Sequence, residues 1–474
     1  MIYIGVIAGV VVVLLTVTII KALTVKNEAD FLVAGRKLPW WVLVSTLLCS
    51  WIGAGSLFAG AENATHIGFA ALWQPAGGWV GLILIFTIAG RARRFAQYTV
   101  PDLLENRYNT AARVLGTVAI VIAYTMITSY QMKAGGDILH LIFPELDRAR
   151  GMYMVAAFVI AFTAGAGMAS VAYLDLVIGA LVTAIVLYAF PVLLHGAGGW
   201  TAVRQALPAS HFQILGPISF ERALGLMIPT TLLLIGNQGM YQKFFSARSE
   251  RDARVSVIGW TLGTLVLETL IVAIAVFGRA LYPTGEAALH PREIIPYTAR
   301  HGLPAVMGAL LLGAVFAKVI STASNYLFSP ATNLVEDVFV RYIAPGASNR
   351  RVLLISRLAV AVLGCWALYQ ALYAESILEK MLYAYTIYSA ALTPVVLAAF
   401  YSKRATAWGA VAAIATGTAV TLVWDTPGVK ALFPPILAQR DAIFPALFAA
   451  VIALVVVSAV TPRPTAEQLA KVAD

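Results

Sequence analysis

Apolar residues form long, nearly uncharged runs along the chain, and short polar segments separate them. A helix needs about 20 apolar residues to cross a bilayer, and thirteen runs reach or approach that length. Numbered from span 0 to span 12, the predicted spans cover residues 2–25, 40–62, 69–90, 112–143, 152–167, 170–195, 219–241, 255–281, 303–341, 351–373, 376–401, 405–425 and 441–461. The pattern therefore predicts an all-α polytopic membrane protein with about 13 transmembrane helices.

The composition agrees with this prediction. The 474 residues are 60% hydrophobic and 12% charged, whereas soluble globular proteins average about 45–50% apolar and about 25% charged residues. The net charge of +10 is compatible with nucleic-acid binding, but the basic residues stand in short clusters between apolar runs. Membrane topology and lipid headgroups explain such clusters better. We therefore expect membrane lipid and no nucleic acid as a partner, and the oligomeric state stays open.

Lysine and arginine residues set the expected orientation. Counted over alternate loops, eighteen of them lie on one side of the membrane and ten on the other. The side with more basic residues is cytoplasmic by the positive-inside rule. This predicts a multi-pass protein of the plasma (inner) membrane with its N-terminus outside and its C-terminus in the cytoplasm. The short tail after Thr461 disfavours a membrane receptor that only senses a solute, which is the alternative from another functional class.

Two predicted spans carry pairs of glycines in their middle, Gly53 and Gly55 in span 1 and Gly236 and Gly239 in span 6. Glycine costs about 1 kcal/mol relative to alanine inside a helix, so both helices can unwind there, although small residues also serve close helix packing. Each of these spans opens a run of five. Because five is odd, the second run crosses the membrane in the opposite sense. Interrupted helices at matching positions of two inverted halves predict a binding site near the bilayer midplane.

Short segments of the chain resemble motifs of the sodium:solute symporter family, which includes sugar, proline, sialic acid and choline cotransporters. In chain order they are Phe31–Pro39, Ser50–Ser56, Thr99–Tyr108, Met168–Asp175, Tyr241–Arg248 and Ser321–Asn325. The resemblance implies a single transporter domain with a leucine-transporter-type fold. Its parts are an extra N-terminal helix, two inverted five-helix repeats and two extra C-terminal helices, over residues 2–25, 40–195, 219–401 and 405–461. The span 1 motif is most similar to the choline-type branch, but Asn237 stands where that branch has an aromatic residue.

The resemblance also implies cation sites between spans 1 and 8. It assigns one Na⁺ to three backbone carbonyls and two hydroxyls, those of Cys49, Ile52, Lys318, Ser321 and Thr322. Some members hold a second Na⁺, whose ligands match Asp175, Ser321, Ser324 and Asn325. A broken helix frees carbonyl oxygens, which suit Na⁺, and an intramembrane carboxylate is a functional candidate. From spacing alone, hydroxyls that bond back to carbonyls of their own helix are the commoner explanation.

Lys318 departs from the family pattern, in which a small residue is usual at this position. Three interpretations stay open. The side chain snorkels to the cytoplasmic edge of the membrane, or it pairs with Asp175 beside a working sodium site, or its ammonium takes the place of a cation. The third interpretation predicts a proton-coupled or cation-independent carrier.

Polar and aromatic residues near the two glycine pairs and in spans 2, 3 and 10 are candidates for the solute pocket. They are Trp51, Ser56, Gln74, Tyr124, Tyr130, Gln131, Asn237, Gln238, Tyr241, Tyr383 and Tyr385. Binding sites combine apolar walls with a few placed polar groups, although lipid-facing positions explain the tyrosines equally well. Glu62, Lys133, Asp137 and Glu268 also lie at or near membrane depth, and their roles are open.

Together these features predict secondary active transport, in which a small polar organic solute moves by sodium-coupled symport and alternating access. The expected partners are the solute, Na⁺ or H⁺, and membrane lipid, with no cofactor besides the coupling ion. No glycine-rich phosphate loop precedes a Lys-Ser or Lys-Thr pair, and Ser56 has no obvious histidine partner. We therefore expect neither an ATP-driven pump nor an enzyme.

Overall fold

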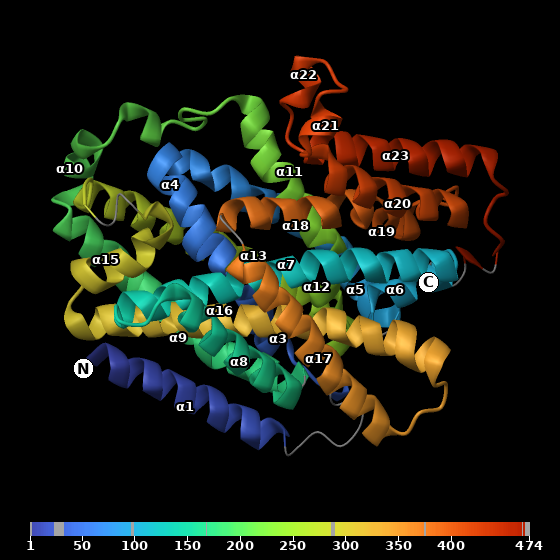
Figure 1. Ribbon diagram of the computed structural model, residues 1–474, viewed down its shortest axis with the longest axis horizontal. Coiled ribbons are helices and arrows are strands. Elements are labelled where there is room, and N and C mark those ends of the chain that lie inside the picture. The colour runs from blue at the N-terminus through green and yellow to red at the C-terminus, as the bar shows by residue number, and fades with distance from the viewer. Residues whose placement is uncertain are drawn as a thin grey trace.

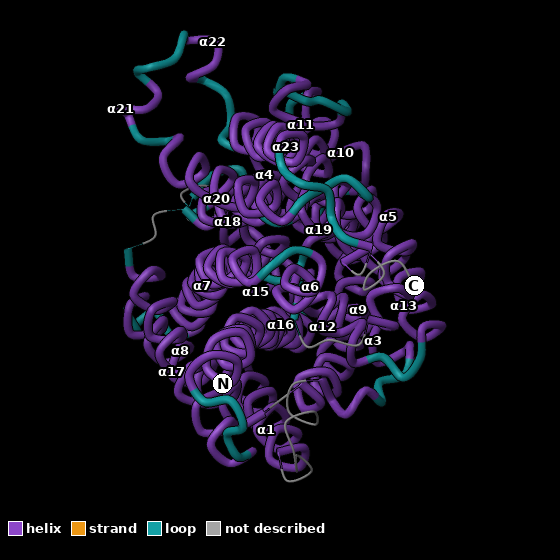
Figure 2. The backbone as a smooth tube through the Cα atoms, turned by 90° about the vertical axis from the view of Figure 1, so that its right-hand side faces the viewer, coloured by secondary structure: helices purple, strands orange, loops and turns teal. Residues whose placement is uncertain are grey.

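The computed structural model describes residues 2–22, 33–95, 99–166, 168–285, 290–373, 376–466 and 468–469, and helices dominate this part of the chain (Figures 1 and 2). Its only strand-like pairing is an isolated bridge between Leu38 and Ala247. The predicted all-helical class is therefore confirmed for the described residues.

The first half of the chain consists of long helices and short helical segments. In chain order they are α1 Ile2–Ala22, η1 Ala34–Arg36, α3 Trp40–Trp51, η2 Gly55–Gly60, α4 Ala61–Ile67, η3 Gly68–Leu72, α5 Trp73–Phe95, α6 Val100–Arg107, α7 Thr110–Ile142, α8 Arg148–Ala166, α9 Met168–Gly196, α10 Gly199–Ala206 and η4 Ala209–Phe212. The η2 segment is a π-helix, a form that often occurs at functional sites.

The second half repeats the alternation of broken and continuous helices. Its helices are α11 Phe220–Gly236, α12 Gln238–Ser246, α13 Glu250–Leu281, η5 Pro291–Glu293, α15 Ile294–Gly302, α16 Ala305–Asn333, η6 Leu334–Ile343, α17 Asn349–Leu372, α18 Ile377–Ala391, α19 Thr393–Tyr401, α20 Ala407–Trp424, α21 Pro427–Lys430, α22 Pro435–Ala438 and α23 Ile443–Val460. Several begin at side-chain caps, as at Ser219, Ser249, Ser376 and Thr406, which satisfy free N–H groups of the first turn.

Ten helices of the described residues are long and apolar enough to cross a membrane. The sequence predicted thirteen spans. Three predicted spans, at residues 2–25, 40–62 and 152–167, have no counterpart among these ten. They fall on α1, on the broken segment from α3 to α4, and on α8. Residues 23–25 and 167 lie outside the described residues. Span 1 fails as one continuous helix because its middle is unwound, which leaves α3 with only 12 residues.

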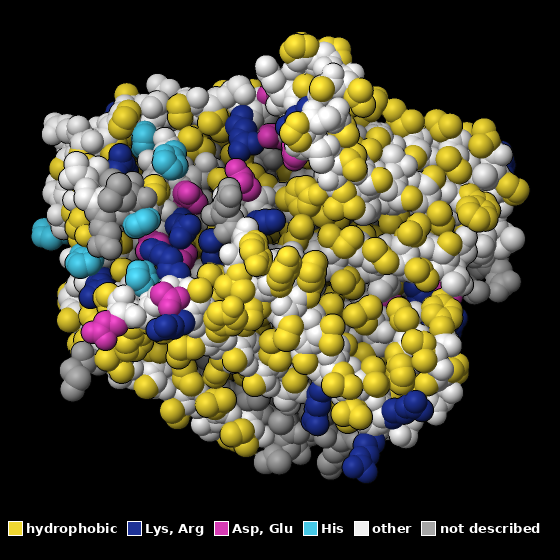
Figure 3. Space-filling view, in the orientation of Figure 1, with side chains coloured by type: hydrophobic (Ala, Val, Ile, Leu, Met, Phe, Trp, Pro, Cys, Tyr) yellow, Lys and Arg dark blue, Asp and Glu magenta, His cyan; other side chains and the backbone are white. Residues whose placement is uncertain are grey.

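Helix α16 lies at the centre of the molecule and contacts α7, α9, α1, α8 and α3. Helices α5, α11 and α13 pack together on another side, and α20 and α23 pair with each other (Figure 1). Hydrophobic side chains cover most of the middle of the visible face in Figure 3, whereas charged and histidine side chains gather near α10 and α15. This distribution places a lipid-compatible surface around the α16 core.

Candidate functional site

The first broken helix lies against α7 and α16. Helix α3 ends at Trp51, and Ile52 has an extended backbone with a ψ of 110°. A Cβ on Gly53 would meet the side chains of Gln131 and Thr322 at 2.8 Å, so only glycine allows α7 and α16 to approach the break this closely. The Gln131 Oε1 accepts a hydrogen bond from the N–H of residue 54 at 2.8 Å. The break predicted in span 1 is therefore present, and α7 stabilises it.

The second broken helix is built around Asn237. Helix α11 ends at Gly236, Asn237 is extended with a ψ of 110°, and its side chain caps α12 by accepting from the Met240 N–H. The Tyr124 hydroxyl donates to Asn237 Oδ1 at 2.7 Å and accepts from the Gly239 N–H at 3.0 Å. The predicted break in span 6 is also present, and an asparagine cap closes it.

Backbone carbonyls of α3 and α16 converge on the Thr322 hydroxyl. Its Oγ1 lies 3.0 Å from the Cys49 carbonyl oxygen, 3.3 Å from that of Ile52 and 2.9 Å from that of Lys318. Carbonyls in the last turn of a helix have no partner within that helix, and one hydroxyl proton serves one acceptor at a time. Four of the five predicted ligands of the first Na⁺ therefore point to a common position. Ser321 is the exception, because its hydroxyl donates to Asp175 instead.

Asp175 of α9 is fully buried, and its carboxylate accepts three hydrogen bonds. The donors are the Thr46 hydroxyl at 2.5 Å, the Asn325 amide at 3.3 Å and the Ser321 hydroxyl. The structure thus brings together three of the four residues predicted for a second cation. Ser324 does not join them, because its hydroxyl bonds the Ile320 carbonyl of its own helix at 2.9 Å.

Two buried lysines lie beside these groups. Lys318 is 2% exposed, and its Nζ donates to the Leu48 carbonyl oxygen at 3.3 Å. The snorkelling interpretation of Lys318 is therefore wrong. No ion pair within the described part of the chain joins Lys318 to Asp175, so the direct pair is not formed either. The end of α3 attracts a cation because helix C-termini are partially negative.

Lys243 is the second buried lysine, and it lies beyond the end predicted for span 6 at residue 241. Its Nζ donates to Asn325 Oδ1 at 3.0 Å and to the Gly239 carbonyl at 3.3 Å. Helix α12 continues to Ser246, beyond the end predicted for span 6, and carries Lys243 into the interior. In the sequence, Lys243 follows Gly239 by four residues, which is about one helical turn. This spacing was the signal that could have placed Lys243 on the same helix face as the break.

Six of the predicted pocket residues gather near the first break. They are Trp51, Ser56, Gln74, Tyr130, Gln131 and Tyr385. The position of a Cβ on Gly55 lies 3.3 Å from the Tyr385 hydroxyl and 3.7 Å from that of Tyr130, whereas Gln74 lies near Gly60 and Trp51 against Gly78. The Ser56 hydroxyl donates to Glu268 of α13 at 2.7 Å. These contacts place Glu268, which sequence reasoning left without a role, at the same centre.

The other predicted pocket residues lie elsewhere. Tyr124 and Asn237 bond each other at the second break. The Gln238 side chain accepts from the Val100 N–H of α6, and Tyr241 stacks on Phe400 with ring centroids 6.3 Å apart. Tyr383 is only partly buried. The structure therefore does not place Gln238 and Tyr241 next to Trp51 and Ser56, because the turn at residue 237 directs α12 toward α6.

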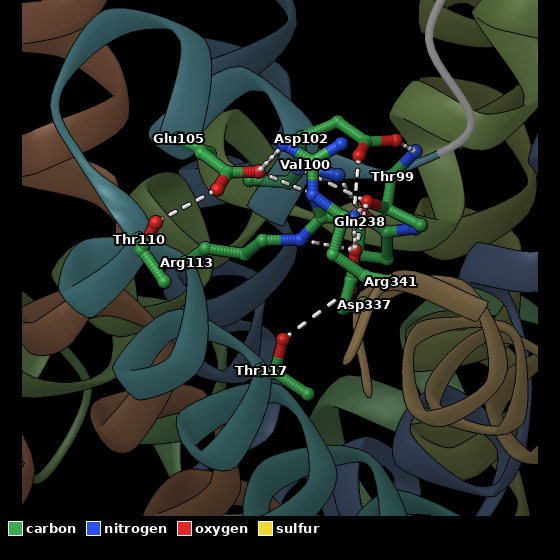
Figure 4. A network of polar contacts seen from close by, with 10 residues as sticks. All are labelled: Thr99, Val100, Asp102, Glu105, Thr110, Arg113, Thr117, Gln238, Asp337 and Arg341. Carbon is green, nitrogen blue, oxygen red and sulfur yellow. Dashed lines mark hydrogen bonds and ion pairs between the residues drawn. The ribbon is translucent and has the colours of Figure 1, made fainter. Parts of the chain in front are cut away.

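A network of charged side chains closes the molecule around α6 (Figure 4). Arg113 at the start of α7 pairs with Asp337 of η6 at 2.6 Å and with Asp102 of α6 at 2.7 Å, and it also pairs with Glu105. The Thr99 hydroxyl donates to Asp337 at 3.0 Å. Partial burial alone would raise the pKa of Glu105, but hydrogen bonds and the charge of Arg113 lower it below its usual value. The Glu105 carboxylate is thus held ionised beside the Arg113 guanidinium.

Comparisons with known proteins give one consistent result. The model of the sodium:solute symporter family matches residues 31–417. An osmoregulated proline transporter of Bacillus subtilis (strain 168) is 26% identical over 457 residues, which cover 92% of this chain and 90% of that relative. A high-affinity proline transporter of the same organism is 25% identical over 427 residues, covering 85% of this chain and 88% of the relative.

Two solved structures share the fold at low sequence identity. A substrate-bound, outward-open Na⁺-coupled sialic acid symporter has a TM-score of 0.82 at 16% identity, over 98% of both chains. A nucleobase-cation-symport-1 family transporter in a closed conformation has a TM-score of 0.62 at 14% identity, over 94% of this chain and 99% of the other. At this sequence identity, the two comparisons show that the described helices share the fold of these proteins.

Proposed function

This chain belongs to the sodium:solute symporter family, and we infer that it is a secondary transporter that couples the movement of Na⁺ to that of a small polar organic solute. The family resemblance of the sequence motifs is thereby confirmed over most of the chain. The observation that carries the mechanism is the set of oxygens at the first break, where carbonyls of Cys49, Ile52 and Lys318 surround the Thr322 hydroxyl.

The proposed architecture is a leucine-transporter-type fold. Residues 40–195 and 219–401 form two inverted five-helix repeats, with one crossing before them and two after them, which gives thirteen crossings. Each repeat begins with a broken helix, and this correspondence supports the assignment. The N-terminus lies outside, and the α6 end of the molecule faces the cytoplasm, in agreement with the distribution of Lys and Arg.

Transport proceeds by alternating access around the first break. Na⁺ at the Thr322 position holds α3 and α16 together, and the solute binds beside it between Trp51, Ser56 and Tyr385. The transporter then closes on the side from which the solute entered and opens at the α6 end. This change releases Na⁺ and the solute into the cytoplasm. The two proline transporters among the relatives support an amino-acid-like solute. A receptor that only senses the solute would produce no flux.

A second candidate is a carrier driven by H⁺ or by no cation. The buried Lys318 ammonium at the C-terminal end of α3 favours it, because a helix C-terminus attracts any cation. In this candidate the ammonium takes over the role of Na⁺ in joining α3 to α16.

Uptake of labelled L-proline into proteoliposomes separates these functions. Na⁺-coupled transport predicts that an inward Na⁺ gradient drives accumulation above the external concentration, and that Lys318→Ala keeps this Na⁺ dependence. The second candidate predicts accumulation under a pH gradient without Na⁺, and a Lys318→Ala variant that gains Na⁺ dependence. Equal internal and external concentrations under both gradients would contradict coupled transport of this solute.

A further inference from the structure

Glu268 is a buried carboxylate that the cation site leaves unused. It lies in α13 with 4% of its surface exposed, and the Ser56 hydroxyl donates to it at 2.7 Å. None of the ion pairs among the described residues includes Glu268. The Lys318 ammonium influences it electrostatically but is hydrogen-bonded to a carbonyl of α3. Burial of a carboxylate without a paired cation is unfavourable, so this position suits a positively charged ligand.

A second hydrogen-bond acceptor nearby has no donor. The side-chain oxygen Oε1 of Gln74 is buried and lacks a hydrogen-bond partner. It lies 3.6 Å from the position of a Cβ on Gly60, one turn after Ser56 on the same broken segment. Buried polar atoms in proteins almost always have a partner. The Gln74 oxygen therefore indicates a donor that enters from outside the chain.

The side chains around this point retain small accessible surfaces. The exposed fractions are 8% for Trp51, 7% for Ser56, 6% for Gln74 and 5% for Tyr385. At the second break, by contrast, Asn237 has no exposed surface. The remaining accessible surface at these residues thus lies beside a carboxylate, an unpaired amide oxygen and two aromatic side chains. Aromatic faces attract cations, and oxygen acceptors attract N–H groups.

We propose that the transported solute carries a protonated nitrogen and that Glu268 is the specificity residue that pairs with it. The Gln74 oxygen accepts a second hydrogen bond, and Trp51 and Tyr385 line the cation. This assignment rests on the proposed transport function and adds the charge of the solute to it. Hydrogen bonds between ions are roughly twice as strong as those between neutral groups. A solute of the same shape without the charge leaves Glu268 unpaired.

The variant Glu268→Gln tests this role without removing the local architecture. Glutamine keeps an oxygen that accepts the Ser56 hydrogen bond, and it removes only the negative charge. Glu268→Asp keeps the charge at a shorter reach and serves as the conservative variant. Glu221→Gln is the matched control, because Glu221 pairs with Arg440 at the surface and its side chain is 42% exposed.

Binding is measured on the full chain in nanodiscs at constant pH and Na⁺, with pairs of solutes that differ only in the nitrogen. The pairs are L-proline with cyclopentanecarboxylate, and L-alanine with 2-methylpropanoate. In at least one pair, we expect the nitrogen-containing solute to bind at least about tenfold more tightly than its carbon counterpart. The carbon counterpart leaves buried hydrogen-bond acceptors unpaired. Glu268→Gln should reduce this preference at least about tenfold, Glu268→Asp should retain part of it, and Glu221→Gln should retain it fully.

Three outcomes would overturn the assignment. The first is equal binding of both members of each pair by the wild type, and the second is an unchanged preference in Glu268→Gln. The third is an unchanged affinity in Glu268→Gln with lost pH dependence of uptake, which would assign the carboxylate to proton transfer. Na⁺-driven uptake of a neutral solute would refute the charged nitrogen while the transport function stands, so the two failures are distinguishable.

Discussion

At the scale of single residues, the site depends on atoms that the backbone supplies. Three of the four oxygens at the candidate cation position are carbonyls, and they converge because Gly53 lets α7 and α16 approach the end of α3. The hydroxyl of Thr322 completes the set from the opposite helix. A change at either residue therefore alters the site without changing the charge of the protein.

Gly53→Ala should disrupt this approach. The added methyl group would meet Gln131 and Thr322 at 2.8 Å, and overpacking of this kind costs about 1–3 kcal/mol. We expect a lower thermal unfolding midpoint and loss of solute uptake in proteoliposomes. Gly9→Ala is the matched control, because no atom lies within 4 Å of a Cβ at that position of α1. Normal uptake by Gly53→Ala would show that the close approach is not required.

At the scale of helices, α6 joins the second broken helix to the end of the central helix. Its first N–H bonds Gln238 of α12, and its cap Thr99 bonds Asp337 of η6. Arg113 of α7 completes the network (Figure 4). In the proposed transport cycle the α6 end opens, and these contacts then have to break. We therefore expect the network to stabilise the closed form of this end.

Arg113→Ala should weaken the closed form. It leaves Asp337, which is 1% exposed, without its cation, and breaking a buried ion pair typically costs about 3–5 kcal/mol. We expect a lower thermal unfolding midpoint. Arg150→Ala, which breaks an exposed pair with Asp147, should cost less than about 1 kcal/mol. Equal effects of the two variants would contradict a latch role for Arg113.

The helices and both breaks were predictable, because long apolar runs and paired glycines report on the local backbone. The direction of side chains after a break was not. One extended residue at Asn237 turns α12, so Gln238 and Tyr241 point toward α6 and α19, and Lys243 enters the interior. The burial of Lys318 also depends on which helices surround α16, and no local pattern contains that information.

At the scale of the whole molecule, the buried polar groups of the site lie within a largely hydrophobic core. Helix α16 carries Lys318, Ser321, Thr322 and Asn325 on the face that meets α3 and α9, and η6 extends the same helix to the α6 network. The candidate cation position and the charged network thus lie on one continuous element. A cation that joins α3 to α16 can therefore influence the closed end through this element.

The most direct test of the central claim is the Na⁺ dependence of uptake by Thr322→Ala. Thr421→Ala of α20 is the matched control, because Thr421 is equally buried and bonds the Gly417 carbonyl four residues earlier. If the oxygens at the break hold the coupling ion, the Na⁺ concentration for half-maximal uptake should rise at least about tenfold in Thr322→Ala and stay unchanged in Thr421→Ala. Identical Na⁺ dependence of Thr322→Ala and wild type would contradict the account.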